Sequence, residues 1–292
     1  MREQAAIRDV LRAAAAVLAE AGISSARNDA ELLAAHAGGV DRGRLPIFDP
    51  PADFYDRYDE LVAARARRIP LQHLTGTAAF GPLLLDVGPG VFIPRPETEA
   101  LLECATAELD RRDLRSPRIV DLCTGSGALA LALARHRPSA TVTAVDDSAE
   151  ALRYARRNCA GTGVELVEAD VCHRGLLPRL RGQVDLVVAN PPYIPDGAEL
   201  EPEVCEHDPH HALFGGPDGM AVIEAIARLS AGWLRPGGLL AVEHDDTTSQ
   251  RTVDVIAATG CFDEVIARAD LTGRPRFVTA VRSADQEGDE PL

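Results

Sequence analysis

A polar loop follows a buried strand in the stretch Val184-Asp185-Leu186-Val187-Val188-Ala189-Asn190-Pro191-Pro192-Tyr193. The first six residues form a short, Val-rich apolar run, which predicts a strand over residues 184–189. Ligands of open α/β sheets bind at the carboxyl ends of strands, so the loop is a candidate binding site. Its two prolines lack backbone N–H groups and fix φ, which makes the loop stiff. The Asn190 amide, the carbonyl oxygens and the Tyr193 ring suit a flat substrate that carries an NH2 group.

Strands and helices alternate from Arg118 onward. We expect strands at 118–122, 141–146, 164–169, 184–189, 238–243, 263–268 and 276–281. We expect helices at 127–136, 148–160, 219–232 and 248–259. Such alternation is typical of the α/β class, in which helices cover a mainly parallel sheet.

The region before Arg118 has a different character. Amphipathic or Ala-rich stretches predict a small bundle of helices at 2–21, 28–37 and 53–68. Gly and Pro interrupt short apolar runs over residues 71–91, which favours a β-hairpin connector. A helix is then expected to open within Phe92–Glu99 and to continue to about Leu109.

These patterns divide the chain into parts that differ in composition. We expect a helical bundle at 1–74, a β-hairpin linker at 75–91, an α/β domain at 92–283 and a disordered acidic tail at 284–292.

Charge and cysteine usage limit the class of protein. The chain has 292 residues and a formal net charge of −15 at pH 7, so we expect no direct contact with nucleic acid. The six cysteines form no C-x-x-C pair, which indicates neither a zinc site nor a disulfide framework. The sequence shows neither a signal peptide nor an uncharged apolar run of about 18 residues. We therefore expect a cytoplasmic monomer without metal or membrane association.

A second candidate loop, Cys123-Thr124-Gly125-Ser126-Gly127, follows the strand expected at 118–122. Glycine lets the backbone turn sharply and approach a ligand closely. About 20 residues further on, Asp146 ends the next strand, where its carboxylate can accept hydrogen bonds from ribose hydroxyls. The pattern predicts a nucleoside-containing ligand, but it also matches the dinucleotide fingerprint G-x-G-x-x-G/A. Methyl transfer from S-adenosylmethionine to a planar NH2 group explains the Asn-Pro-Pro-Tyr loop, whereas hydride transfer does not.

The sequence resembles the HemK/PrmC-type protein-(glutamine-N5) methyltransferases over about residues 5–282. The resemblance rests on Asp121–Gly127, Asn190–Tyr193, Ile93–Glu99, Pro70–Gly76, Glu203–Leu213 with Gly215–Gly219, and Arg274–Phe277. It implies a seven-stranded, Rossmann-like class I methyltransferase domain that uses S-adenosylmethionine and no metal. It also implies class 1 peptide chain release factors as partners, with the glutamine of their Gly-Gly-Gln loop as the methyl acceptor. The helical bundle could then dock the protein substrate or act as a stabilising cap.

The resemblance also implies roles for individual residues. Cofactor contacts fall on Cys123, Thr124, Gly125, Ser126, Gly127, Asp146 and Asn190, and Val171 stands where relatives often place an aromatic side chain against adenine. Asp170 is expected either to contact the adenine edge or to serve as a helix N-cap or loop acid. Substrate contacts fall on Asn190, Pro191, Pro192 and Tyr193. Arg95 and Glu97 either bind substrate or form a salt bridge at a helix start. Glu243-His244-Asp245-Asp246 replaces the Glu-Ile-Gly of many members, and this strand end is expected either to border the pocket or to form a polar loop.

Positioning is the main requirement for methyl transfer to an amide nitrogen. We expect the Asn190 side-chain oxygen and the Pro191 carbonyl to accept one substrate N–H each, and Tyr193 to stack on the amide. No carboxylate general base is expected. A DNA or RNA adenine N6-methyltransferase is the alternative, because it shares Asn-Pro-Pro-Tyr, although the net charge opposes it. A non-catalytic nucleotide-binding regulator is the third interpretation.

Overall fold

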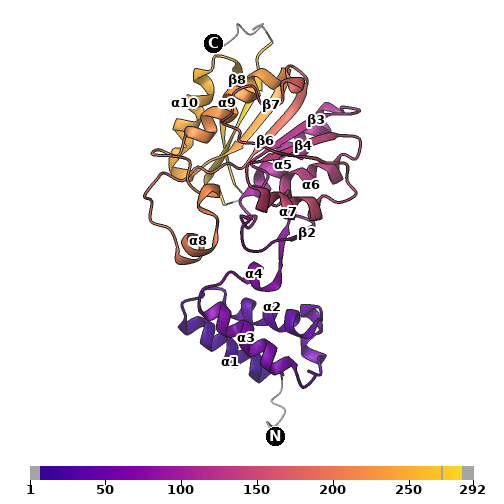
Figure 1. The fold of residues 1–292 in the computed structure, drawn as a ribbon, viewed down its shortest axis with the longest axis vertical. Coiled ribbons are helices and arrows are strands. Elements are labelled where there is room, and N and C mark those ends of the chain that lie inside the picture. The colour runs from indigo at the N-terminus through magenta and orange to yellow at the C-terminus, as the bar shows by residue number, and fades with distance from the viewer. Residues whose placement is uncertain (1–6, 271, 285–292) are drawn as a thin grey trace. The chain divides into compact units, whose positions relative to one another are not determined.

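The computed structural model describes residues 7–270 and 272–284 (Figure 1). The chain divides into two compact units. Unit 1 comprises Met1–Thr77 and Leu200–His207, and unit 2 comprises Ala78–Glu199 and Asp208–Leu292. The chain therefore passes between the units at three places. Apart from Ala284, the tail expected at 284–292 lies outside the described residues.

Unit 1 is a helical bundle with its own apolar core. Its elements are α1 (Ile7–Glu20), α2 (Ala26–Gly38), the 3-10 helix η1 (Arg42–Ile47), α3 (Phe54–Ala66), α4 (Leu71–Thr75) and α8 (Pro202–His207). Leu18, Leu33 and Phe54 are fully buried in this core. The hydroxyl of Tyr58 on α3 donates a hydrogen bond to the Ala30 carbonyl at 2.9 Å, which ties α3 to α2.

Most helices of unit 1 lie where the sequence predicts them. The helices predicted at 28–37 and 53–68 are confirmed, and so is the helix predicted at 2–21 over its described part, from Ile7 onward. The prediction for residues 71–75 is wrong, because they form α4 rather than the start of a β-hairpin connector. The Pro70 carbonyl accepts hydrogen bonds from the backbone N–H groups of His73 and Leu74, at 3.0 and 3.2 Å. Pro70 is thus the N-cap of α4, four residues after the end of α3 at Ala66.

The expected hairpin consists of β1 (Thr77–Phe80) and β2 (Leu83–Asp86). Alternate side chains of the two strands point into the core of unit 2, as Phe80 and Leu85 do, while Leu84 is exposed. The hairpin therefore packs against the α/β unit as well as connecting it in sequence to the bundle.

Unit 2 is built on a sheet of seven strands in the order β5-β4-β3-β6-β7-β9-β8. The strands are β3 (Arg118–Leu122), β4 (Thr141–Asp146), β5 (Glu165–Glu168), β6 (Val184–Ala189), β7 (Leu234–Glu243), β8 (Phe262–Ala269) and β9 (Pro275–Arg282). The first five pair in parallel, and β9 pairs antiparallel with β7 and β8. The α/β class and the mainly parallel sheet are thus confirmed.

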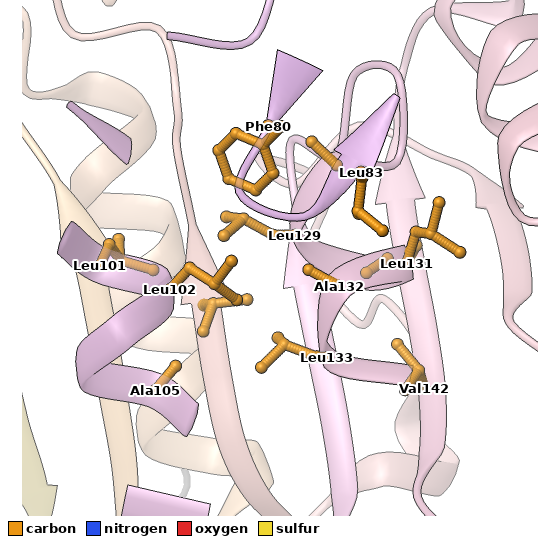
Figure 2. Close-up of a cluster of buried hydrophobic side chains, with 14 of the residues drawn as sticks. Phe80, Leu83, Leu101, Leu102, Ala105, Leu129, Leu131, Ala132, Leu133 and Val142 are labelled. Atoms are coloured by element: carbon orange, nitrogen blue, oxygen red, sulfur yellow. The ribbon is translucent and has the colours of Figure 1, made fainter. Parts of the chain in front are cut away.

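Helices cover both faces of this sheet. One face packs against α5 (Thr98–Arg112), α6 (Ala128–His136), α7 (Ala149–Asn158) and the hairpin, as Figure 2 shows for part of the cluster. The other face packs against α9 (Ala221–Trp233) and α10 (Ser249–Ala258). Adjacent strand residues face opposite sides of the sheet, for example Ile119 and Val120, which explains why the central strands are mostly apolar.

The helix expected to open within Phe92–Glu99 begins only at Thr98. Pro94 and Pro96 disfavour the helical conformation in the residues that precede them, so the segment stays non-helical up to Pro96. This late start places the Thr98 side chain, which is 4% exposed, at the first turn of α5.

Candidate active site

The sheet register aligns the candidate residues along one edge. Leu122 pairs with Ala189 and with Val145, and Ala189 pairs with Val242. The next residue on each strand is therefore at the same level: Asp146, Cys123, Asn190 and Glu243. The strand order reverses direction between β3 and β6, and such switch points form ligand crevices in α/β sheets.

The loop Cys123–Gly127 is held by Asp121, to which the sequence argument gave no separate role. The Thr124 hydroxyl and the Ala130 N–H donate to Asp121 Oδ2 at 2.5 and 3.0 Å. Asp121 is buried, and this burial raises its pKa to about 7. The carboxyl group therefore fixes the loop to the first turn of α6.

The two glycines of this loop serve different purposes. Both have positive φ, +56° at Gly125 and +83° at Gly127. A Cβ on Gly127 would lie 3.0 Å from Cys159 Sγ, so this glycine allows close packing against α7. A Cβ on Gly125 would meet no atom within 4 Å, so the backbone there is open to a ligand. Cys123 also has a positive φ of +58°, and burial raises the pKa of its thiol, so the side chain packs rather than reacts.

Asp146 supports the same loop from the end of β4. The Gly125 N–H donates to Asp146 Oδ2 at 2.7 Å, and the Ser148 N–H donates to Oδ1 at 3.0 Å. Burial raises the pKa of Asp146, and these two bonds oppose the shift. A carboxylate oxygen can accept two hydrogen bonds, so both oxygens retain capacity for ligand hydroxyls. Asp146 thus lies beside the open space at Gly125.

Asp170 and Val171 follow β5, next to Asp146 in the sheet. Asp170 is exposed, and its Oδ1 accepts a hydrogen bond from the Cys172 N–H at 2.7 Å, as a loop acid does. Val171 is 7% exposed and packs in the core on the α9 face. The structure thus brings both residues to the same edge as the glycine loop.

Asn190 is held by Thr98, which sequence reasoning did not select, and Tyr193 is held by Glu243, which it placed either at the pocket border or in a polar loop. The Asn190 Nδ2 group donates to Thr98 Oγ1 at 3.1 Å. The Tyr193 hydroxyl donates to Glu243 Oε1 at 3.1 Å. Thr98 lies within a stretch that carried the family resemblance, and Glu243 lies at the end of the strand beside β6. Those positions are the only sequence signals for their involvement.

A glycine-rich segment fixes the backbone of the Asn190–Tyr193 loop. The Ile194 N–H donates a hydrogen bond to the Leu213 carbonyl, and the Gly215 N–H donates one to the Ile194 carbonyl, both at 2.9 Å. A Cβ on Gly215 would lie 2.6 Å from the Pro192 carbonyl oxygen, and one on Gly219 would lie 2.2 Å from that of Tyr193. These glycines let the two backbones lie side by side.

Comparison with known proteins decides the family. Residues 9–76 match the PrmC N-terminal domain, and residues 89–207 match the methyltransferase small domain. A Mycobacterium tuberculosis protein named release factor glutamine methyltransferase is 65% identical over 282 residues, which cover 94% of this chain and 91% of the relative. The chain belongs to the release factor glutamine methyltransferase family. This family consists of S-adenosylmethionine-dependent methyltransferases, as the resemblance implied.

Similarity extends beyond the release factor glutamine methyltransferases. A 4-amino-L-phenylalanine/4-methylamino-L-phenylalanine methyltransferase from Streptomyces pristinaespiralis is 42% identical over 278 residues, which cover 91% of each chain. The solved T. thermophilus 16S rRNA N2 G1207 methyltransferase is 21% identical, with a TM-score of 0.50, over 70% of this chain and 49% of that one. This second likeness shows the methyltransferase fold alone.

Arg95 and Glu97 are the residues expected either to bind substrate or to form a salt bridge at a helix start. Arg95 Nη2 forms an ion pair of 2.6 Å with Asp208 Oδ2, and its guanidinium lies 5.1 Å from the centroid of the Phe92 ring. Asp208 is buried, so Arg95 fixes the Phe92–Glu97 segment to the distant loop at 208. Its salt bridge is therefore not a local one at the helix start. Glu97 is exposed at the N-cap of α5.

The segment Glu243–Asp246 departs from the Glu-Ile-Gly of many family members. Glu243 and His244 are both buried, and His244 Nδ1 lies 2.7 Å from the Asp245 carbonyl oxygen. Burial raises the pKa of Glu243 to about 7, although hydrogen bonds from Thr98 and Tyr193 and the charge of Arg276 oppose this rise. Burial, followed by the charge on Glu243, raises the pKa of the Tyr193 hydroxyl.

Metal binding and membrane insertion have no structural signal in the described residues. Over residues 7–270 and 272–284, no group of three or more His, Cys, Asp or Glu side chains could hold a metal ion. Within the same residues, no helix is both long enough and apolar enough to span a membrane.

Proposed function

We propose that this chain transfers a methyl group from S-adenosylmethionine to the side-chain amide nitrogen of the Gly-Gly-Gln glutamine in class 1 peptide chain release factors. Family membership supports the reaction, and the orientation of Asn190 supports the acceptor. The donor end of the Asn190 amide lies on Thr98, so its oxygen lies on the opposite side. An oriented amide oxygen can accept a substrate N–H, which a planar amide provides.

The proposed cofactor site uses the loops at the carboxyl ends of β3, β4 and β5. S-adenosylmethionine, when bound, supplies a methyl group on a positively charged sulfonium. Asp146 would accept hydrogen bonds from ribose hydroxyls, and Asp170 and Val171 would contact the adenine. The backbone of Cys123, Thr124, Gly125, Ser126 and Gly127, together with Asn190, would hold the remainder. The open backbone at Gly125 is the observation that supports this assignment.

The proposed acceptor site uses the stiff loop after β6. Asn190 Oδ1 and the Pro191 carbonyl would each accept one N–H of the glutamine amide, while Pro192 and Tyr193 would bound the flat group. These bonds would aim the nitrogen lone pair and favour the pyramidal, electron-rich nitrogen of the transition state. Positioning of this kind can contribute roughly 7–11 kcal/mol. The new N–C bond forms as the C–S bond breaks and S-adenosylhomocysteine leaves; the methylated nitrogen is then acidic enough to release its proton to water, so no carboxylate general base is required.

Substrate recognition would involve the rest of the chain. We propose that the bundle at 1–74 docks the release factor, that the hairpin at 75–91 links it to the methyltransferase domain at 92–283, and that Glu97 contacts the substrate. Arg95 would order the same segment through Asp208. The enzyme would act as a cytoplasmic monomer, where release factors are available.

Methyl transfer to purified acceptors tests this proposal. Tritiated S-adenosylmethionine is offered with a release factor, its Gly-Gly-Ala variant, duplex DNA or 4-amino-L-phenylalanine. We expect label on the release factor and none on the Gly-Gly-Ala variant. Label on DNA alone would support the adenine methyltransferase alternative, which the net charge of −15 opposes. Label on the amino acid alone would assign the chain to the chemistry of its 42% identical relative.

A further inference from the structure

Two residues outside the acceptor loop connect its two functional side chains. Asn190 and Glu243 follow the paired residues Ala189 and Val242, so they stand at one level on neighbouring strands. Glu243 receives the Tyr193 hydroxyl at 3.1 Å, and Thr98 receives the Asn190 amide at 3.1 Å. Both Glu243 and Thr98 are at least 95% buried. The acceptor loop is therefore held from the core side by polar groups that solvent hardly reaches.

The Thr98 hydroxyl can join the two halves of this arrangement. A hydroxyl accepts and donates at once, so Thr98 can accept from Asn190 and direct its own proton elsewhere. The acceptor of this proton is Glu243, because a hydrogen bond with the Thr98 hydroxyl lowers the pKa of that carboxyl. No group in the described residues makes a geometrically complete hydrogen bond to Glu243 Oε2.

A carboxylate suits this position better than an amide would. Tyr193 and Thr98 are both hydroxyl donors, and an ionised carboxylate is purely an acceptor with two oxygens. A glutamine would present an NH2 group to one of them. The charged groups that act on Glu243 are Arg276 on β9, which favours the ionised form, and Glu97, which opposes it.

We propose that Glu243 and Thr98 are positioning residues that hold Asn190 and Tyr193 in one fixed geometry for the acceptor amide. The proposal rests on the proposed function, because it assigns Asn190 and Tyr193 to the amide. Neither residue touches the cofactor loop through a hydrogen bond given by the structure. Their loss should therefore change turnover far more than cofactor binding.

The first test compares Thr98→Val, Thr98→Ser and Thr106→Val. Valine keeps the shape of threonine but removes the hydroxyl, and serine keeps the hydroxyl. Thr106 is a matched control on the same helix, where its hydroxyl bonds to the Leu102 and Glu103 carbonyls. We expect Thr98→Val to lower kcat by about ten- to hundredfold, with Thr98→Ser and Thr106→Val within about threefold of wild type. The Kd for S-adenosylmethionine should change by less than about threefold in all.

The second test uses Glu243→Gln and the pH profile of kcat. Wild-type kcat should rise as the pH passes about 7, where Glu243 loses its proton, and Glu243→Gln should lower kcat and flatten that rise. If Thr98→Val keeps wild-type kcat, or if the Gln variant keeps the same profile, the positioning role is wrong. If wild-type enzyme labels no release factor at all, the proposed function itself fails, so the two failures are distinguishable.

Discussion

Asn190 has a donor end and an acceptor end, so its truncation separates cofactor binding from turnover. Asn190→Ala removes the oxygen proposed to hold the substrate N–H and the amide that rests on Thr98. We expect kcat to fall by at least about 10²-fold, because misplaced reactants lose the benefit of orientation. Calorimetric titration should give a Kd for S-adenosylmethionine within about fivefold of wild type. Turnover that survives nearly intact would contradict the proposed acceptor geometry.

Two buried carboxyl groups should make the stability of the fold depend on pH. Asp121 and Glu243 each have a folded-state pKa of about 7, above their usual 3.8 and 4.5, mainly because of burial. A raised folded-state pKa stabilises the protein below the unfolded-state pKa, and this stability is lost as the pH rises through about 7. We expect each of the two groups to lower the free energy of unfolding by roughly 2–3 kcal/mol between about pH 5 and pH 8.

Urea denaturation across this pH range measures the effect. Asp121→Asn and Glu243→Gln should each flatten the dependence, because neither amide titrates. Asp263→Asn, at an exposed position on β8, is the matched control and should leave the slope as it is. A stability that is constant from about pH 5 to pH 8 in wild type would overturn the assignment of both groups.

The sequence predicts the residues of the site better than it predicts their partners. Asn190, Tyr193 and the loop at 123–127 follow apolar strands directly, so their place at a sheet edge can be deduced from chain order alone. Thr98 and Glu243 reach the site through strand register and through the late start of α5. The end of the predicted strand at 238–243 already indicates a place at the pocket border or in a polar loop for Glu243, whereas no local pattern encodes the late start of α5 that brings in Thr98.

At the level of elements, the glycine-rich segment should decide whether the acceptor loop keeps its shape. Gly219 has a φ of +76°, and an added Cβ would lie 2.2 Å from the Tyr193 carbonyl oxygen, so the loop would have to shift. We expect Gly219→Ala to lower stability by about 2 kcal/mol or more and to reduce kcat at least about tenfold. Thermal denaturation and the methyl transfer assay measure both.

Gly232→Ala is the control for this substitution. Gly232 lies inside α9, and its Cβ would meet no atom within 4 Å. Alanine is favoured over glycine in a helix, so this variant should be neutral or more stable by up to about 1 kcal/mol. Equal losses of stability and kcat in the two variants would show that the absence of a Cβ next to the Tyr193 carbonyl is not the reason why glycine is required at position 219.

Strands could be predicted more accurately than connectors for a physical reason. A strand buried on both faces must be apolar along its length, as Val184–Ala189 is, and this signal survives without any partner. Residues 71–75 carry no such signal, and Pro70 fits the end of one helix as well as the start of the next. Only tertiary packing decides between those possibilities.

The chain as a whole returns to unit 1 for a short segment within the methyltransferase region. Residues 200–207 belong to unit 1, where Glu203 on α8 forms ion pairs with Arg65 and Arg68 at 3.0 and 3.4 Å. This segment lies between the acceptor loop and Asp208 in the sequence, so unit 1 includes a piece of chain that interrupts unit 2. A division of the chain into consecutive domains, as predicted from composition, cannot include a later segment that belongs to the first unit.

The buried ion pairs of unit 1 should allow the two units to be distinguished in unfolding. Arg65 is 5% exposed and pairs with Asp29 at 2.8 Å as well as with Glu203. Arg65→Met leaves the carboxylate of Asp29 buried without its partner, which typically costs about 3–5 kcal/mol. In denaturant titrations, we expect this variant to unfold in two steps, of which only the first moves to lower denaturant. Arg179→Met removes a half-exposed pair with Glu165 in unit 2 and should cost about 1 kcal/mol or less. A single transition that shifts as a whole in Arg65→Met would show that the two units unfold as one.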